Sequence, residues 1–198
     1  MKTLRPLFFL SAVALAAFLA GCNILPEASP ENARHFVLEA SPARAEAAPA
    51  GALTIGMRPV EVATYLRGKA MAVRVGDNEV RYAHDAFWAE PLDAGIARVL
   101  RESLATRATV LPYPFPAQLP RDYDLTVRVL SAEGGASGVR FVAVIELLRV
   151  GDRPELVVRR EFTAPATAWG NDYGQLARGL SQAVAALADE VIASAPKK

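Results

Sequence analysis

Two amphipathic segments, one in the middle of the chain and one near its end, constrain the fold most strongly. Apolar residues recur at the helical period of 3.6 in both segments, which predicts two helices with one apolar face each. The positions are Leu92, Ile96, Val99, Leu100 and Leu104 in the first segment, and Leu176, Leu180, Val184, Leu187 and Val191 in the second. Each apolar face must be buried against another layer of structure, so neither helix can stand alone.

The rest of the body reads as short strands that would form this other layer. Strands are expected over residues 35–40, 53–62, 70–83, 108–116, 122–133, 139–150 and 156–164, with a hairpin turn at Gly76-Asp77-Asn78 inside the third stretch. Pro91 suits the first turn of the first helix, and Asn171 or Asp172 can cap the second. We therefore expect one α/β domain, in which a mixed β-sheet carries both amphipathic helices.

The N-terminus has the layout of a secretory signal peptide. Lys2 and Arg5 precede an uncharged apolar run over residues 7–19, and the small residues Ala20 and Gly21 follow. A membrane-spanning helix needs about 20 apolar residues, and this run is shorter. The leader over residues 1–21 is therefore predicted to be removed on export.

The leader ends at Cys22, the single cysteine of the chain. The sequence Leu19-Ala20-Gly21-Cys22 resembles a bacterial lipobox. This resemblance implies a diacylglycerol thioether on Cys22, cleavage between Gly21 and Cys22, and acylation, such as palmitoylation, of the new amino group. The alternative is an ordinary signal peptide followed by a free thiol, which is a liability in an exported protein. Two or more acyl chains anchor a protein stably to a membrane.

The segment after the anchor bears on sorting and on the length of the tether. Asn23 differs from the aspartate that tends to retain enterobacterial lipoproteins at the inner membrane, so we expect the inner leaflet of the outer membrane, facing the periplasm. Residues 22–34 contain Pro26 and Pro30 and are predicted to be a lipidated N-terminus and tether. Residues 195–198 are predicted to be a mobile tail.

Residues that could carry catalysis are sparse. The two histidines, His35 and His84, lie far apart in sequence, and His84 and Asp85 would point to opposite faces of a strand. Ser103 and Ser181 lie on the predicted helices. A single cysteine excludes an intramolecular disulfide and a zinc site built from several thiolates. The net charge of +1 gives no indication of a nucleic-acid partner. We therefore predict no enzymatic activity, no metal and no cofactor.

Aromatic residues flank the first predicted helix on both sides. Phe87 and Trp88 precede this helix together with Pro91, and Tyr113 and Phe115 follow it. Such residues are either lids over the core or a patch that binds a partner protein, because aromatic side chains are enriched at the centres of interfaces. The sequence leaves both interpretations open.

Several motifs together resemble a known family. They are a GxxPVxxxxYL segment (Gly56, Pro59, Val60, Tyr65, Leu66), the segment WAEPL (Trp88–Leu92) leading into the helix GIARVL, then YPF, DYDLTVRVL and the final Ala-rich helix. In this order they are similar to the ABC-type transport auxiliary lipoproteins, the PqiC-like family. The resemblance covers nearly all of the mature chain. The chain departs from the family at Ala86-Phe87, where members tend to have an arginine before the tryptophan, and at His35-Phe36, which replaces a tyrosine pair.

The resemblance implies a domain over residues 35–194 with an α/β sandwich similar to anticodon-binding domains or the N-terminal domain of TolB. It also implies a non-enzymatic accessory subunit of an intermembrane lipid transport system that supports membrane integrity. The implied partner is an MCE-domain protein of an ABC-type or PqiAB-like transporter, with self-association also open. A lipid-binding carrier is the alternative and would need a sizeable apolar cavity. A tethered hydrolase would need a nucleophile–base pair, which the sequence does not offer.

Overall fold

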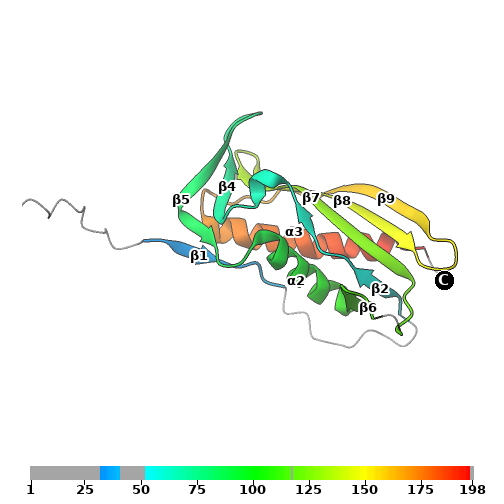
Figure 1. The fold of residues 1–198 in the computed structure, drawn as a ribbon. Helices are drawn as coiled ribbons and strands as arrows, with labels where there is room; N and C mark the ends of the chain where they lie inside the picture. The colour runs from blue at the N-terminus through cyan, green and yellow to red at the C-terminus, as the bar shows by residue number, and fades with distance from the viewer. Residues whose placement is uncertain (1–31, 41–51, 117, 197–198) are drawn as a thin grey trace, which may run out of the picture. The chain divides into compact units, whose positions relative to one another are not determined.

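The computed structural model describes residues 32–40, 52–116 and 118–196. Within them the chain forms one nine-stranded β-sheet and two α-helices (Figure 1). The elements are β1 (Arg34–Phe36), β2 (Thr54–Met57), β3 (Glu61–Val62), a 3-10 turn η1 (Thr64–Leu66), β4 (Ala70–Arg74), β5 (Val80–Trp88), α2 (Leu92–Ala105), β6 (Thr109–Pro112), β7 (Tyr123–Gly135), β8 (Gly138–Arg149), β9 (Glu155–Thr163) and α3 (Tyr173–Ser194). The predicted α/β class with a mixed sheet and two helices is confirmed.

The long strand β7 organises the sheet. On one side it pairs antiparallel with β8, which in turn pairs antiparallel with β9. On the other side, three short strands pair parallel with successive parts of β7: β2 with its start, β3 with its middle and β4 with its end. Strand β6 lies outside β2, while β5 lies outside β4 and carries β1 at its own outer edge. The two ends of β7 are therefore separate neighbourhoods, with β2 and β6 at one and β4, β5 and β1 at the other.

The stretch predicted as one strand over residues 53–62 is two strands. Pro59 lies between β2 and β3 and has no N–H to offer to a ladder, so the pairing is interrupted there. The N–H of Arg58 still donates to the carbonyl of Leu125 at 3.0 Å, which keeps the interrupted chain alongside β7. The break thus turns one predicted strand into two short ones without detaching it from the sheet.

Three other predicted boundaries differ from the structure. Strand β1 ends at Phe36 rather than residue 40, because Leu38 is 1% exposed and its carbonyl accepts a hydrogen bond from the guanidinium of Arg98 on α2. Strand β5 runs on to Trp88, since its second half pairs with β1. The strand predicted to end at residue 133 runs on to Gly135, which pairs with Gly138 across a two-residue turn.

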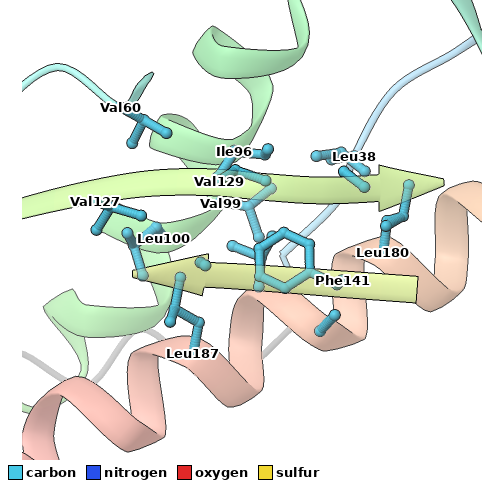
Figure 2. Close-up of a cluster of buried hydrophobic side chains, with 14 of the residues drawn as sticks. Leu38, Val60, Ile96, Val99, Leu100, Val127, Val129, Phe141, Leu180 and Leu187 are labelled. Atoms are coloured by element: carbon cyan, nitrogen blue, oxygen red, sulfur yellow. The ribbon is translucent and has the colours of Figure 1, made fainter. Parts of the chain in front are cut away.

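The core lies between one face of the sheet and both helices, which Figure 1 shows on the same side of the sheet. Alternate residues of β7 face this core, and all four are at most 4% exposed: Tyr123, Leu125, Val127 and Val129. The apolar positions predicted for the two helices are likewise at most 4% exposed. Figure 2 shows Ile96 and Leu100 of α2 and Leu180 and Leu187 of α3 meeting the strand residues Val127 and Phe141. Both predicted helix faces are confirmed.

A shift in register between β7 and β8 changes which residues face the core. The pairing slips between Val129 and Ser131, so from there on the even-numbered residues of β7 lie opposite core residues such as Phe141. Continued alternation would have sent Glu133 into the core. The shift instead places Glu133 on the other face of the sheet, called here the open face because neither α2 nor α3 covers it.

The helix starts follow from local chemistry. Asp172 caps α3, as its Oδ1 accepts from the N–H of Gly174 at 2.7 Å and of Gln175 at 3.4 Å. Asn171, the other residue predicted as a cap, has a left-handed conformation with φ of 58° and precedes the cap. Pro91 lies just before α2 and makes no side-chain cap. Beyond α3, Ala195 is buried and the carbonyl of Pro196 accepts from the Tyr123 hydroxyl, so only residues 197–198 of the predicted tail lie outside the described residues.

Candidate functional site

The predicted partner surface divides into two parts in the structure. Trp88, at the end of β5, is 4% exposed and belongs to the core, so it takes the role of a core lid and is not a surface anchor. Phe87 is half-buried, with its ring centroid 5.9 Å from that of His35 on β1. Pro91 is exposed at the start of α2. The part of the predicted surface before α2 therefore offers a partner little aromatic area.

Tyr113 and Phe115 lie in a proline-rich segment after β6. Residues 113–116 and 118–120 are called the arm here. Tyr113 is 55% exposed, and its ring packs edge to face against Phe115 with centroids 5.4 Å apart. Leu119 is 48% exposed, so the arm presents a large aromatic and a large aliphatic side chain to solvent. Aromatic side chains such as that of Tyr113 are enriched at the centres of protein interfaces.

The structure does not bring the two parts together. Phe87 and Trp88 lie on β5, beside β4, which pairs with the end of β7. The arm follows β6, which pairs with β2 beside the start of β7. Eleven residue steps along β7 separate these neighbourhoods, or about 35 Å of extended strand. The five predicted residues therefore do not form one patch, and the arm is the part that stays exposed.

A cluster of charged residues on the open face holds the arm in place. The ring of Phe115 lies against two guanidinium groups, 4.4 Å from that of Arg121 and 5.8 Å from that of Arg58. Both arginines bind the carboxylate of Asp124, whose side chain is only 5% exposed: Arg121 through Nε and Arg58 through a guanidinium nitrogen at 3.1 Å. The hydrogen bond with Asp124 raises the pKa of the Arg121 guanidinium. We call Arg58, Phe115, Arg121 and Asp124 the clamp.

Gly56 explains part of the GxxPVxxxxYL motif through the clamp. A Cβ atom at position 56 would lie 2.8 Å from Cδ of Arg121 and 2.9 Å from both Oδ1 of Asp124 and Cε1 of Phe115. Side-chain carbon atoms do not approach other atoms this closely, so only glycine allows the clamp to close over β2. In the same motif, Val60 and Leu66 are buried in the core.

Tyr65, the next residue of the motif, belongs to a second charged cluster that the sequence did not indicate. Its hydroxyl donates to the carboxylate of Glu133, which is fully buried and also accepts from Nε of Arg74. Burial of the ring, followed by the bond to Glu133, raises the pKa of Tyr65. The bond to Glu133 likewise raises the pKa of Arg74. The cluster forms because the register shift in β7 turns Glu133 to the open face, which alternation in the sequence could not reveal.

The residues considered for catalysis have structural roles or lie exposed. Ser181 donates to the carbonyl of Ala177 and accepts from the N–H of Glu39, so its hydroxyl is committed to packing α3 against the segment after β1. His35 and His84 are both exposed. Within residues 32–40, 52–116 and 118–196, no three His, Cys, Asp or Glu side chains come close enough to hold a metal ion.

The residues predicted for membrane attachment are not part of the domain described above. Gly21, Cys22 and Asn23 lie outside the described residues, as do the leader over residues 1–21 and most of the tether. The tether as predicted ended at Arg34, whereas β1 already begins there. Among the described residues, neither helix is long and apolar enough to span a membrane.

Comparison with known proteins identifies relatives at the level of family and fold. A family model described as "ABC-type transport auxiliary lipoprotein component" matches residues 36–192. No curated protein sequence matches the chain significantly. A solved structure titled only as an uncharacterized protein is 19% identical, with a TM-score of 0.63 over 80% of this chain and 95% of that one. A Xanthomonas campestris protein of the DUF330 family model is 17% identical, with the same TM-score over 80% of this chain and 91% of that one. At these identities the two structures show a shared fold.

Proposed function

Because the chain belongs to the family of ABC-type transport auxiliary lipoprotein components, we propose that it is a non-enzymatic accessory subunit of an ABC-type intermembrane lipid transport system. In this proposal the body works by binding another protein, and a lipid on Cys22 keeps it at the inner leaflet of the outer membrane. The partner is an MCE-domain protein of the transporter. The family supports the accessory role, and the surface of the domain supports a role in binding.

The observation that carries the proposal is the arm. Its Tyr113 is 55% exposed, yet the neighbouring Phe115 is fixed by the clamp over a buried carboxylate. A tyrosine side chain has few rotatable bonds and so loses little conformational entropy on binding, which is one reason why tyrosines are frequent at the energetic centres of interfaces. Tyr113 replaces Trp88 as the proposed anchor.

The lipid anchor limits where the arm can act. Twelve residue steps separate Cys22 from Arg34 at the start of β1. A fully extended chain of this length spans about 40 Å. The proposed anchor therefore keeps the domain within roughly that distance of the membrane surface, where it can hold a partner that reaches the membrane from the periplasm.

A lipid-binding carrier is less well supported than an adaptor. A carrier needs an apolar cavity among its core side chains. The side chains between the sheet and the helices interdigitate instead: those of β7 that face α2 and α3, together with Ile96, Leu100 and Leu187, are at most 4% exposed. Figure 2 shows Val127 and Val129 of β7 in one cluster with Ile96, Leu100 and Leu187. A packed core with an exposed aromatic arm fits a protein that binds through its surface.

Co-purification from solubilised envelopes tests the proposal. The tagged full-length chain should retain an MCE-domain protein, and Tyr113→Ala should lower the amount retained at least fivefold. Tyr82→Ala is the matched control, because Tyr82 is 51% exposed but lies on β5, away from the arm. Equal retention by wild type and Tyr113→Ala would remove the arm from the proposal, and the absence of any transporter component would contradict the proposed function itself.

Metabolic labelling with a fatty-acid probe tests the anchor separately. The wild-type chain should incorporate the probe, and Cys22→Ala should not, because the proposed thioether forms on the Cys22 sulfur. The variant should also keep its leader, since the proposed cleavage between Gly21 and Cys22 follows lipidation. Equal labelling of both chains would show that the lipid is attached elsewhere or not at all.

A further inference from the structure

Strand β1 forms an outer edge of the sheet, next to a groove against α3. Among the described residues, β1 pairs with β5 alone, and the chain beyond it continues along α3. The groove has a volume of about 490 Å³. One wall is the segment from His35 to Ala40, and the other is a row of α3 residues. The groove lies far from the arm, because β1 belongs to the neighbourhood at the other end of β7.

The backbone of β1 presents hydrogen-bonding groups to this groove. The carbonyl of Phe36 accepts from the N–H of Ala89, so Phe36 faces β5. Backbone groups alternate in direction along a strand, so those of His35 and Val37 face the opposite side. The N–H of Glu39, two residues on, confirms this direction by donating to Ser181 on α3 at 3.0 Å. Within the described residues, no hydrogen bond outside the β1–β5 ladder reaches the backbone of His35 or Val37.

The far wall of the groove is shaped to accept side chains. Four small residues of α3 line it at helical spacing: Gly174, Ala177, Ser181 and Ala185. On the near wall, Val37 is 43% exposed, which leaves an apolar side chain available beside the free backbone groups. An extended chain laid along β1 would place every second side chain against this row, because side chains in a strand alternate between two faces.

Two residues of opposite charge, Glu39 and Arg178, line the groove. Arg178 lines it, is exposed and forms no ion pair within the described residues. The other charged residue of the lining, Glu39, also forms no ion pair within the described residues, and Arg98 nearby already binds Glu90 at 2.6 Å. Arg34 at the start of β1 is already paired with Asp85 at 3.0 Å. Arg178 can therefore pair with an acidic side chain of a ligand.

We propose that this groove binds an extended peptide segment of a partner protein, which adds to the sheet as a strand beside β1. Its backbone pairs with His35 and Val37, its small or apolar side chains pack against α3, and an acidic side chain faces Arg178. Strand addition of this kind draws affinity from main-chain hydrogen bonds and specificity from pockets for alternate side chains. The site is separate from the arm and does not depend on the function proposed above.

Selection from a phage-displayed library of random dodecapeptides supplies the probe. The full-length chain, purified in detergent, is the target, and the enriched peptides are synthesised with a fluorescent label for measurement of Kd by polarisation. Val37→Pro removes the N–H that faces the groove, and proline is tolerated at an edge strand where that group is not in the ladder. We expect Val37→Pro to raise Kd at least tenfold, whereas Val37→Ala, which keeps the N–H, should raise it less than threefold.

Two further variants test the helix wall and the charge. Ala185→Trp should fill the groove and raise Kd at least tenfold, while Ala186→Trp, one residue along and outside the lining, should not. Arg178→Glu should weaken the binding of peptides that contain an acidic residue. Replacing that residue of the peptide by lysine should restore binding to the variant. Arg101→Glu on α2 is the control for a change in overall charge. Thermal melts of each variant separate lost binding from lost folding.

Three results would overturn the proposal. The first is that no enriched peptide responds to Val37→Pro or Ala185→Trp. The second is that peptides with N-methylated amides bind as tightly as unmodified ones, because strand addition needs those N–H groups. The third is that labelled palmitate binds wild type and Val37→Pro alike but not Ala185→Trp, which would identify a groove for acyl chains. None of these results bears on retention through Tyr113, so failure here is distinguishable from failure of the proposed function.

Discussion

The two ends of β7 each stabilise a buried carboxylate, and they do so with different neighbouring residues. Each end buries a carboxylate on the open face of the sheet, Asp124 near the start and Glu133 near the end, with exposed fractions of 4% and 0%. Each carboxylate is bound by arginine and lies next to an aromatic side chain. Buried charges are tolerated only when they are paired and hydrogen-bonded, and both meet this condition.

The difference lies in what each carboxylate fixes. Asp124 is shared by two arginines that also hold Phe115, so the start of β7 orders an exposed arm. Glu133 is bound by one arginine, Arg74 of β4, and by the hydroxyl of Tyr65 in η1. The end of β7 therefore holds the segment from η1 to β4, which precedes β5, against the sheet. We therefore expect changes at the end of β7 to lower stability and changes at its start to affect the arm. The predictions below test this contrast, from the largest expected effect to the smallest.

Trp169→Ala should be the most destabilising change near the end of β7. The indole packs so closely on Gly134 that a Cβ there would lie 2.7 Å from Cζ2, and its Nε1 donates to the carbonyl of Gly135 at 2.9 Å. Loss of a buried tryptophan costs about 3–5 kcal/mol. Urea denaturation measures this loss, and Trp169→Phe should restore part of it. A loss below about 1 kcal/mol would show that this end of the sheet is not tightly packed.

Arg74→Ala should lower the free energy of unfolding by about 3 kcal/mol, because it leaves the fully buried Glu133 carboxylate without a counter-charge. The lower end of the usual range applies, since the Arg74 side chain is 29% exposed. In Arg74→Ala/Glu133→Gln the buried charge is also removed, so the double variant should be more stable than Arg74→Ala alone. A double variant less stable than the single one would mean that packing, not charge, dominates here.

Much of the fold could be predicted because its determinants are local. The helix faces with Leu100 and Leu180 follow from a period of 3.6, and the alternation from Tyr123 to Val129 from a period of 2. The interruption at Pro59 follows from a missing N–H, although the sequence did not show that β3 would resume beside β7. Features that depend on which strands pair could not be predicted from the sequence.

The candidate sites show the same limit. Trp88 and Tyr113 both flank α2 in sequence, yet one is 4% and the other 55% exposed, because Trp88 packs into the core from β5 and the arm leaves β6 at the surface. The cluster around Glu133 depends on a register shift that exists only between paired strands. One sequence feature could have indicated the clamp: Gly56, because a residue without a Cβ allows other side chains to approach the backbone closely. No sequence feature indicated the groove beside β1, because predicting it requires knowing that α3 lies next to that edge.

Arg121→Ala should have a smaller effect on stability than Arg74→Ala, about 1–2 kcal/mol, because Arg58 still neutralises Asp124. Its main effect should be on the arm, as Phe115 loses the closer of its two guanidinium contacts. Limited proteolysis under native conditions should cut the arm faster in this variant, whereas Arg74→Ala should leave the rate at the arm unchanged. Equal cutting in both variants would remove the contrast between the two ends.

Tyr65→Phe should cost about 1 kcal/mol near neutral pH, where it removes one hydrogen bond to Glu133. Burial raises the folded-state pKa of Tyr65 above the ordinary value of 10.0. Above about pH 10 the unfolded chain therefore loses this proton while the folded chain retains it, so stability falls as pH rises. Below that pH the contribution is constant. Urea melts at about pH 8 and pH 10.5 should show the gap between wild type and Tyr65→Phe narrowing, and a constant gap would contradict it.

Tyr113→Ala should have the smallest effect on stability, within about 0.5 kcal/mol, because the side chain is 55% exposed and its ring meets that of Phe115 edge to face. Phe115→Ala is the comparison that gives this result meaning, since Phe115 is half-buried between two arginines and its loss should cost more. If the arm binds a partner, we expect this order of stability losses, because Phe115 supports the arm and the exposed Tyr113 contacts the partner. Thermal melts of the two variants decide it. If Tyr113→Ala is as destabilised as Phe115→Ala, Tyr113 belongs to the clamp, and any loss of partner binding by Tyr113→Ala would then reflect a displaced arm rather than a missing anchor.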